Sequence, residues 1–151
     1  MATELSSITK ALYDTDYVKW IDATVAALKQ GNLDAVDWDN LLEEIEDMGR
    51  SECKSFKSNL IILLLHLLKW QYQPEQRSNS WKGSIVEHRR RILESLEESP
   101  SFRPFLLAEI LAKADQDALD QAEAETGLPR ETFPASCPYK LVDITEKGFL
   151  S

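Results

Sequence analysis

The chain has 151 residues and a hydrophobic content of 43%, which is enough to fold as one domain around a single core. Five glycines and six prolines are few for the turns of a β-sandwich or barrel, whereas abundant Leu, Ala, Glu and Lys favour helix, so we expect an all-α protein. The formal net charge of −9 argues against binding to bulk duplex DNA or to an anionic membrane, since both depend on cationic surface.

The amino terminus, MATELSSITK, lacks the basic and apolar regions of a signal peptide. The longest apolar run, residues 60–68, is too short to cross a bilayer. We therefore expect a cytoplasmic protein. Cys53 and Cys137 are too few for a disulfide framework and lack CxxC spacing, so we expect both to be reduced and structural.

A first helix is predicted over residues 15–30. Asp14 or Thr15 is expected to cap it, and Gly31 supplies a left-handed stop. Its apolar positions recur at helical spacing and are expected to face the core; they are Tyr17, Trp20, Ile21, Val25 and Leu28.

A long second helix is predicted over residues 38–72, capped by Asp37 and ended by Pro74. A glycine such as Gly49 costs only about 1 kcal/mol in a helix interior, so the sequence does not decide whether the helix is interrupted at that position. The apolar stripe of this helix is Trp38, Leu41, Leu42, Ile45, Met48, Cys53, Phe56, Leu60, Leu63, Leu67 and Trp70.

Two further helices are predicted, over residues 80–98 and 101–126. The polar turn Ser78 to Ser80 can cap the third helix, and Gly127 ends the fourth. The stripe of the third helix is Trp81, Ile85, His88, Ile92 and Leu96; that of the fourth is Phe102, Phe105, Leu106, Ile110, Ala114 and Leu119.

Four amphipathic helices in one chain predict a single domain, residues 1–151, folded as an up-and-down four-helix bundle. Residues 127–151 contain three prolines and a short apolar segment over 139–144. We expect them to form an irregular Pro-rich C-terminal strap with one or two helical turns.

A lone histidine, His66, lies within the aliphatic run of the second helix, where its polar ring requires a partner. If the second and third helices are antiparallel, His66 is level with residues 85–89, so that His88 lies nearby. With Asp115 from the fourth helix, the two imidazoles would form a facial triad for a divalent metal. Alternatively, His66 is a neutral structural residue that donates to a carbonyl or carboxylate group. The ExxH, HExxH and CxxC signatures are missing, so no cofactor is evident from the sequence.

An acidic run, EEIED, occupies the first half of the second helix. Glu44 precedes His66 by 22 residues, which is roughly 33 Å along a continuous helix. That separation excludes a joint acid–base site. We expect a solvated acidic face in which Glu44 pairs with a basic residue.

Cations and aromatic residues alternate around the turn between the second and third helices. Such a surface suits an anion pocket or a stacking platform for single-stranded nucleic acid, and internal pairing with nearby acids is the other interpretation. Arg89 lies at the edge of the apolar stripe, where it is placed either to bind a phosphate-containing ligand or to clamp the fourth helix through an acidic residue. The candidate binding residues are Trp70, Gln73, Arg77, Trp81, Lys82 and Arg89.

The chain resembles a bacterial family, domain of unknown function 29, in the segments YDTDYVKW, DWDNLLEEIEDMGRSE, HLLKWQYQP, SWKGSIVEHRRRI, ETGLP and FPASCPY. The resemblance implies a small, mainly helical bacterial protein and implies no activity. The positions that belong to the family pattern are His66, Trp70, Gln73, Pro74, Trp81 and Arg89.

We interpret the chain as an interaction or regulatory module that binds a protein partner or a second copy of itself through the turn region. Two alternatives stay open. One is a hydrolase, or a metal- or anion-binding enzyme, in which His66 is the base or metal ligand and Arg89 stabilises an anion. The other is nucleotide or single-stranded nucleic-acid binding by the basic, Trp-rich turn.

Overall fold

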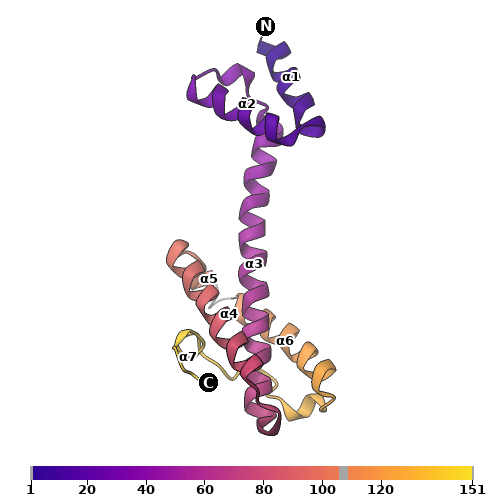
Figure 1. The fold of residues 1–151 in the computed structure, drawn as a ribbon, viewed down its shortest axis with the longest axis vertical. Coiled ribbons are helices and arrows are strands. Elements are labelled where there is room, and N and C mark those ends of the chain that lie inside the picture. The colour runs from indigo at the N-terminus through magenta and orange to yellow at the C-terminus, as the bar shows by residue number, and fades with distance from the viewer. Residues whose placement is uncertain (1, 106–108, 151) are drawn as a thin grey trace. The chain divides into compact units, whose positions relative to one another are not determined.

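The computed structural model describes residues 2–105 and 109–150, and over these residues its secondary structure is helical, without a β-strand (Figure 1). The all-α class predicted from composition is therefore confirmed. Contacts divide the chain into two compact units, residues 1–52 and 53–151, which are described separately. In the described part of the chain, no helix is both long enough and apolar enough to span a bilayer.

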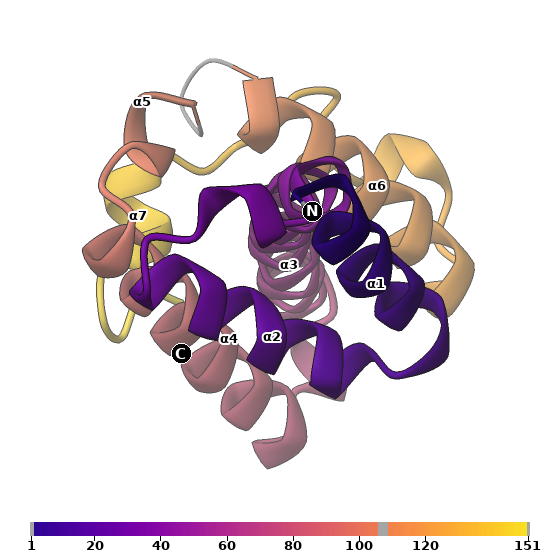
Figure 2. The ribbon, with the colours of Figure 1, turned by 90° about the horizontal axis from the view of Figure 1, so that it is seen from above.

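The first unit contains α1 (Ala2–Thr15), α2 (Tyr17–Lys29), the 3-10 helix η1 (Leu33–Ala35) and the beginning of α3 (Trp38–Tyr72). Helix α1 packs against α2 and η1 (Figure 2). No helix was expected before residue 15, so α1 is a correction. Leu5, Ile8 and Leu12 recur at helical spacing in this segment, and tertiary contacts add to its stability: the Thr9 hydroxyl lies 3.0 Å from the carbonyl oxygen of Ala35.

The start of α2 also differs from expectation, because Asp16 rather than Asp14 or Thr15 caps it. The Asp16 carboxylate accepts a hydrogen bond from the backbone N–H of Lys19 at 3.1 Å. Asp37 caps α3 as predicted, since its carboxylate accepts from the backbone N–H of Asn40 at 3.4 Å. The same buried carboxylate accepts from the indole N–H of Trp20 at 3.2 Å, which ties α2 to α3.

The buried face of α2 is rotated relative to the predicted one. Trp20, Thr24 and Ala27 are buried, whereas four of the five residues expected in the core lie largely at the surface. The helical period was right, but α1, η1 and α3 cover only one side of α2. The exposed members are Tyr17 at 46%, Ile21 at 38%, Val25 at 43% and Leu28 at 41%.

The second unit contains the rest of α3, then η2 (Pro74–Gln76), α4 (Asn79–Glu98), α5 (Phe102–Phe105), α6 (Leu111–Thr126), η4 (Arg130–Thr132) and α7 (Leu141–Thr145). Figures 1 and 2 place α4 and α6 against different sides of α3. Aliphatic side chains from these three helices form the core, which α7 completes with Leu141 and Ile144.

The long helix predicted over 38–72 has the bounds of α3, and Gly49 does not interrupt it. Helix α4 begins one residue before the prediction, and the Ser78 hydroxyl oxygen accepts from the backbone N–H of Trp81 at 3.2 Å. Gly127, with a φ of 70°, ends α6 in the left-handed conformation as predicted.

The single helix predicted over 101–126 corresponds to α5 and α6, and Leu106 lies outside the described residues. Phe102, Ile110, Ala114 and Leu119 are buried as expected. The four-helix arrangement itself is not confirmed, because the helix predicted over 15–30 groups with α1 and η1 in the first unit.

Candidate functional site

Ser84 of α4 brings the two histidines of the chain together. Its Oγ lies 3.4 Å from Nδ1 of His66 on α3 and 3.2 Å from Nδ1 of His88 on α4. All three side chains are half-buried in the second unit. An antiparallel pairing of α3 and α4 predicts this alignment of His66 with His88.

The same ring nitrogens lie 2.8 Å from backbone carbonyl oxygens: Nδ1 of His66 from Ile62, and Nδ1 of His88 from Ser84. A carbonyl oxygen only accepts, so each Nδ1 carries the proton and donates it. Burial lowers the pKa of His66, which favours the neutral form of its ring. Because the nitrogen facing Ser84 carries a proton, it has no lone pair with which to activate that hydroxyl as a nucleophile.

Asp115 lies apart from the histidine pair. It is fully buried on α6, and neither of its carboxylate oxygens has a hydrogen-bond partner among the described residues. Burial raises its pKa, and the nearby Cys137 thiol and the charge of Arg130 oppose this rise without a hydrogen bond to the carboxylate. Burial in turn raises the pKa of the Cys137 thiol to about 11. Within residues 2–105 and 109–150, no three or more His, Cys, Asp or Glu side chains are grouped so as to hold a metal ion.

Arg89 is buried, and its guanidinium holds the carboxy-terminal segment. Its Nε donates to the carbonyl oxygen of Ile144 at 2.8 Å, and its Nη2 donates to that of Phe149 at 2.9 Å. The clamp expected between Arg89 and an acidic residue of the fourth helix is therefore replaced by a clamp on backbone carbonyls. Burial lowers the pKa of Arg89, and the charge of Glu146 opposes that effect.

The cations of the turn are also engaged within the chain. Arg77 stacks 5.0 Å above the ring of Trp70 and donates from Nε to the Trp70 carbonyl oxygen at 2.7 Å. Lys69 lies 4.7 Å from the ring centroid of Trp81 and 3.5 Å from the carboxylate of Glu125. Further along α4, Arg90 and Arg91 pair with neighbouring acids. Gln73 is half-buried and Lys82 is exposed.

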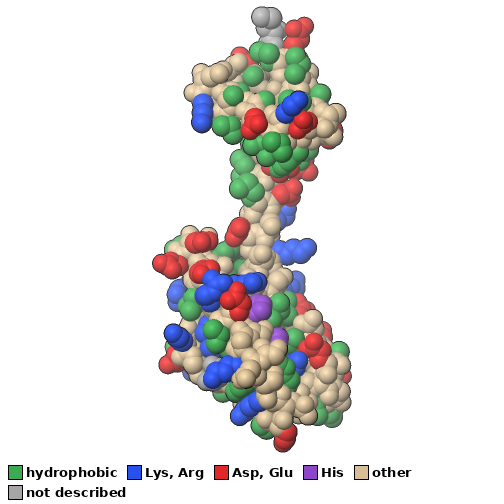
Figure 3. Space-filling model, in the orientation of Figure 1, with side chains coloured by type: hydrophobic (Ala, Val, Ile, Leu, Met, Phe, Trp, Pro, Cys, Tyr) green, Lys and Arg blue, Asp and Glu red, His purple; other side chains and the backbone are tan. Residues whose placement is uncertain are grey.

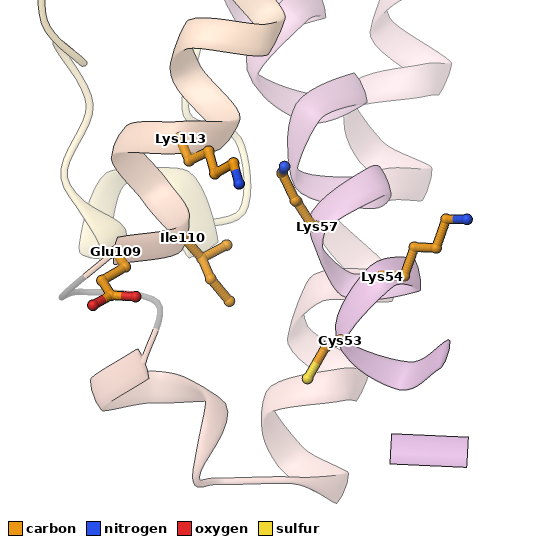
Figure 4. A pocket seen from close by; sticks show the side chains of 6 residues that line it. All are labelled: Cys53, Lys54, Lys57, Glu109, Ile110 and Lys113. Atoms are coloured by element: carbon orange, nitrogen blue, oxygen red, sulfur yellow. The ribbon is translucent and has the colours of Figure 1, made fainter. Parts of the chain in front are cut away.

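A depression of about 330 Å³ lies between α3 and the start of α6 in the second unit. Figure 4 shows Lys57 and Lys113 facing each other across it, with Ile110 below them and Lys54 pointing away. Asp117 lies 3.2 Å from Lys57 and neutralises one of these charges. The sequence held no signal for this depression.

The first unit carries an apolar groove of about 280 Å³ between α2 and the beginning of α3. Hydrophobic side chains gather on the surface of this unit in Figure 3. Several residues of the groove are among the most exposed apolar side chains of the described chain, including Ile45 at 55% and Met48 at 65%. The lining is Tyr17, Trp20, Ile21, Thr24, Val25, Leu28, Leu41, Glu44, Ile45 and Met48.

One carboxylate, that of Glu44, lies in this apolar lining. Its Oε1 accepts from the hydroxyl of Tyr13, and its Oε2 accepts from the hydroxyl of Tyr17 at 2.7 Å. These hydrogen bonds raise the pKa of both tyrosines. The basic partner expected for Glu44 is not found, since no cation of the described residues lies within ion-pair distance of it.

A family model for the domain of unknown function DUF29 matches residues 12–150 of the chain. The chain belongs to the DUF29 family. Neither the comparison with curated proteins nor that with solved structures gave a match. Most of the DUF29 match lies in the second unit, but it begins at residue 12 and includes α2 and the whole groove.

Besides the depression between α3 and α6, two features of this DUF29 domain were not anticipated from the sequence. The docking of the carboxy-terminal segment on Arg89 depends on residues more than 50 positions away, for which the sequence offered no signal. The groove did have a signal, the helical period of residues 17–28 and 38–48, which was interpreted as a core stripe.

Proposed function

We propose that this DUF29 domain is a protein-interaction module whose first unit docks an amphipathic helix of a partner in the groove between α2 and α3. The observation that carries the proposal is the exposure of apolar side chains at helical spacing on both helices. Contiguous apolar surface of this kind, rimmed by polar residues, marks interaction sites more often than chance exposure.

The spacing of the lining supports a helical occupant. On α2, Tyr17, Ile21, Val25 and Leu28 follow steps of four, four and three residues, so they form one ridge. Leu41, Ile45 and Met48 repeat that pattern on α3. The helices cross, and these two ridges border one groove, which an apolar helix face fills by anchors at similar spacing (Figures 1 and 2).

The rival interpretations have less support. The guanidinium of Arg89 is committed to two backbone carbonyls, and His66 donates from the nitrogen that faces Ser84. Arg77 and Lys69 already have aromatic and acidic partners in the turn. A docked helix, by contrast, would bury the exposed apolar residues of α2 and α3, whose helical spacing is the one that core-facing residues of a helix bundle have.

The test uses the full chain and a designed helical peptide of about 18 residues, with leucines on one face and glutamines on the other. Isothermal titration calorimetry should give micromolar affinity. Ile45→Asp should weaken binding by about tenfold or more, because a carboxylate in the groove opposes apolar burial. The control is Val86→Asp, which places the same charge on an exposed β-branched residue of α4. Equal affinities for the two variants, or no binding to the unsubstituted chain, would contradict docking in the groove.

A further inference from the structure

We propose that the helix taken by this groove is basic, with a Lys or Arg placed at the edge of its apolar face to pair with Glu44. This inference rests on the proposed docking function and specifies the chemistry of the partner. Three observations carry it: the division of charge along the chain, the surroundings of Glu44, and the cost of the alternative occupant.

The acidic excess of the chain lies almost wholly in the first unit. Residues 1–52 carry 12 acidic and 4 basic side chains, a net charge of −8, whereas residues 53–151 carry 14 acidic and 13 basic side chains, a net charge of −1. Three of the four cations of the first unit already pair with acids of the same unit: Lys10 with Asp39, Lys19 with Asp16, and Arg50 with Glu46 and Asp47. The unit that carries the groove therefore has a strongly negative net charge, which attracts a cationic partner and speeds its association.

Glu44 concentrates this charge inside the groove. It is half-buried among apolar side chains, and its hydrogen bonds come from two neutral phenols. Each carboxylate oxygen has a further acceptor site, so the group can receive a cation without losing the tyrosines. The hydrogen bond to Glu44 raises the pKa of Tyr17 most, burial raises it next, and the negative charges of Glu44 and Asp47 add to the rise.

A second copy of the chain fits the groove less well. Joining two first units would bring two net charges of −8 together, and like charges within a Debye length of about 8 Å repel at physiological ionic strength. An amphipathic helix carrying Lys or Arg on its polar face meets both requirements of the groove, since it supplies apolar anchors and compensates the carboxylates.

The experiment compares three designed peptides with the same leucine face and with Lys, Gln or Glu on the polar face. Calorimetry with the full chain should rank their affinities as Lys, then Gln, then Glu, with at least about tenfold between the first and the last. Raising the salt concentration should weaken binding of the Lys peptide and leave that of the Gln peptide nearly unchanged, because screening acts only on charge.

The Glu44→Gln variant assigns the effect to one residue. It keeps an oxygen that can accept from a tyrosine but removes the charge, so the Lys peptide should bind about five- to tenfold more weakly and the Gln peptide equally well. The matched control is Asp34→Asn, which removes one negative charge from the same unit at an exposed position outside the groove. It should change the affinity for the Lys peptide by less than about twofold.

The outcomes separate this inference from the docking function. Binding of all three peptides with equal affinity would overturn the basic-partner inference and retain docking. Equal effects of Glu44→Gln and Asp34→Asn would also overturn it, by reducing the preference to net charge. Failure of every peptide to bind would overturn docking itself. Sedimentation of the chain alone as a dimer that Ile45→Asp dissociates would make a second copy the occupant and contradict the inference.

Discussion

Nε of Arg89 donates to the carbonyl oxygen of Ile144 over 2.8 Å and thereby joins positions 55 residues apart in the chain. The bond satisfies a carbonyl at the end of α7, a helix of five residues that is too short to be stable alone. With the second bond to Phe149, it fixes the carboxy-terminal segment against α4. This buried arginine is therefore a structural residue of the second unit.

Replacing Arg89 by Gln should lower the free energy of unfolding of the second unit by about 2–4 kcal/mol, because buried carbonyls lose charge-assisted donors. Urea denaturation measures the change. Arg90→Gln is the control, since Arg90 pairs only with exposed acids of its own helix and should cost less than about 1 kcal/mol. Similar losses for the two variants would show that the Arg89 bonds do not stabilise the fold.

The loss of unfolding free energy on replacing a leucine of α3 by alanine should differ sharply between the two units. Leu63→Ala should cost about 2–5 kcal/mol, because Leu63 is fully buried and its removal leaves a cavity. Leu42→Ala should cost less than about 0.5 kcal/mol, since Leu42 is 55% exposed. Urea denaturation of both variants checks the assignment, and a large loss for Leu42→Ala would place that residue in a core.

Asp115 predicts a fall in stability as pH rises. Burial raises its pKa in the folded state above the ordinary value of 3.8, so the folded chain binds more protons than the unfolded chain between those two pKa values. Stability is highest below the unfolded pKa and falls until the folded pKa is passed. Asp115→Asn, which stays neutral, should be more stable than the unsubstituted chain at pH 8 and should lack this slope in denaturation measured from pH 4 to 8. An unchanged slope would rule out Asp115 as its source.

The lowered pKa of His66 predicts that stability falls as pH is lowered below 7, which is the opposite of the dependence expected from Asp115. Burial lowers its pKa below the ordinary value of 6.5, so the unfolded chain takes up a proton more readily as pH falls through 6.5. Stability should decrease from pH 7 towards the lower pKa of the folded state. His66→Gln should remove this decrease, as measured by urea denaturation at pH 7, 6 and 5. A variant that keeps the full decrease would show that His66 is already protonated, or solvated, in the folded chain.

The bounds of α3 and α4 followed from local signals, namely the Asp37 and Ser78 caps and the helical period of apolar residues. The capped end of α6 at Gly127 followed in the same way. Helix α1 was missed although Leu5, Ile8 and Leu12 recur at helical spacing, and its contact with η1 through Thr9 is tertiary. The role of Arg89 could not be predicted either, because its acceptors are backbone carbonyl oxygens, which every residue type has.

The groove could not be predicted from the spacing of apolar residues alone. The period of Tyr17, Ile21, Val25 and Leu28 identified an apolar face, but a period does not state what covers that face. The same limit applied to Glu44, whose acidic neighbours suggested a solvated surface. Only the fold placed its carboxylate beside Tyr13 and Tyr17 inside an apolar lining.

The central claim is that the groove between α2 and α3 is a docking surface, and hydrogen–deuterium exchange of the full chain with the leucine–glutamine peptide tests it most directly. Backbone amides of residues 17–29 and 41–48 should exchange more slowly in the presence of the peptide, because docking suppresses local opening of the helices that it contacts. Residues 79–98 of α4 should be unaffected. Protection centred on the turn over residues 69–82, or no protection in α2 and the start of α3, would contradict the claim.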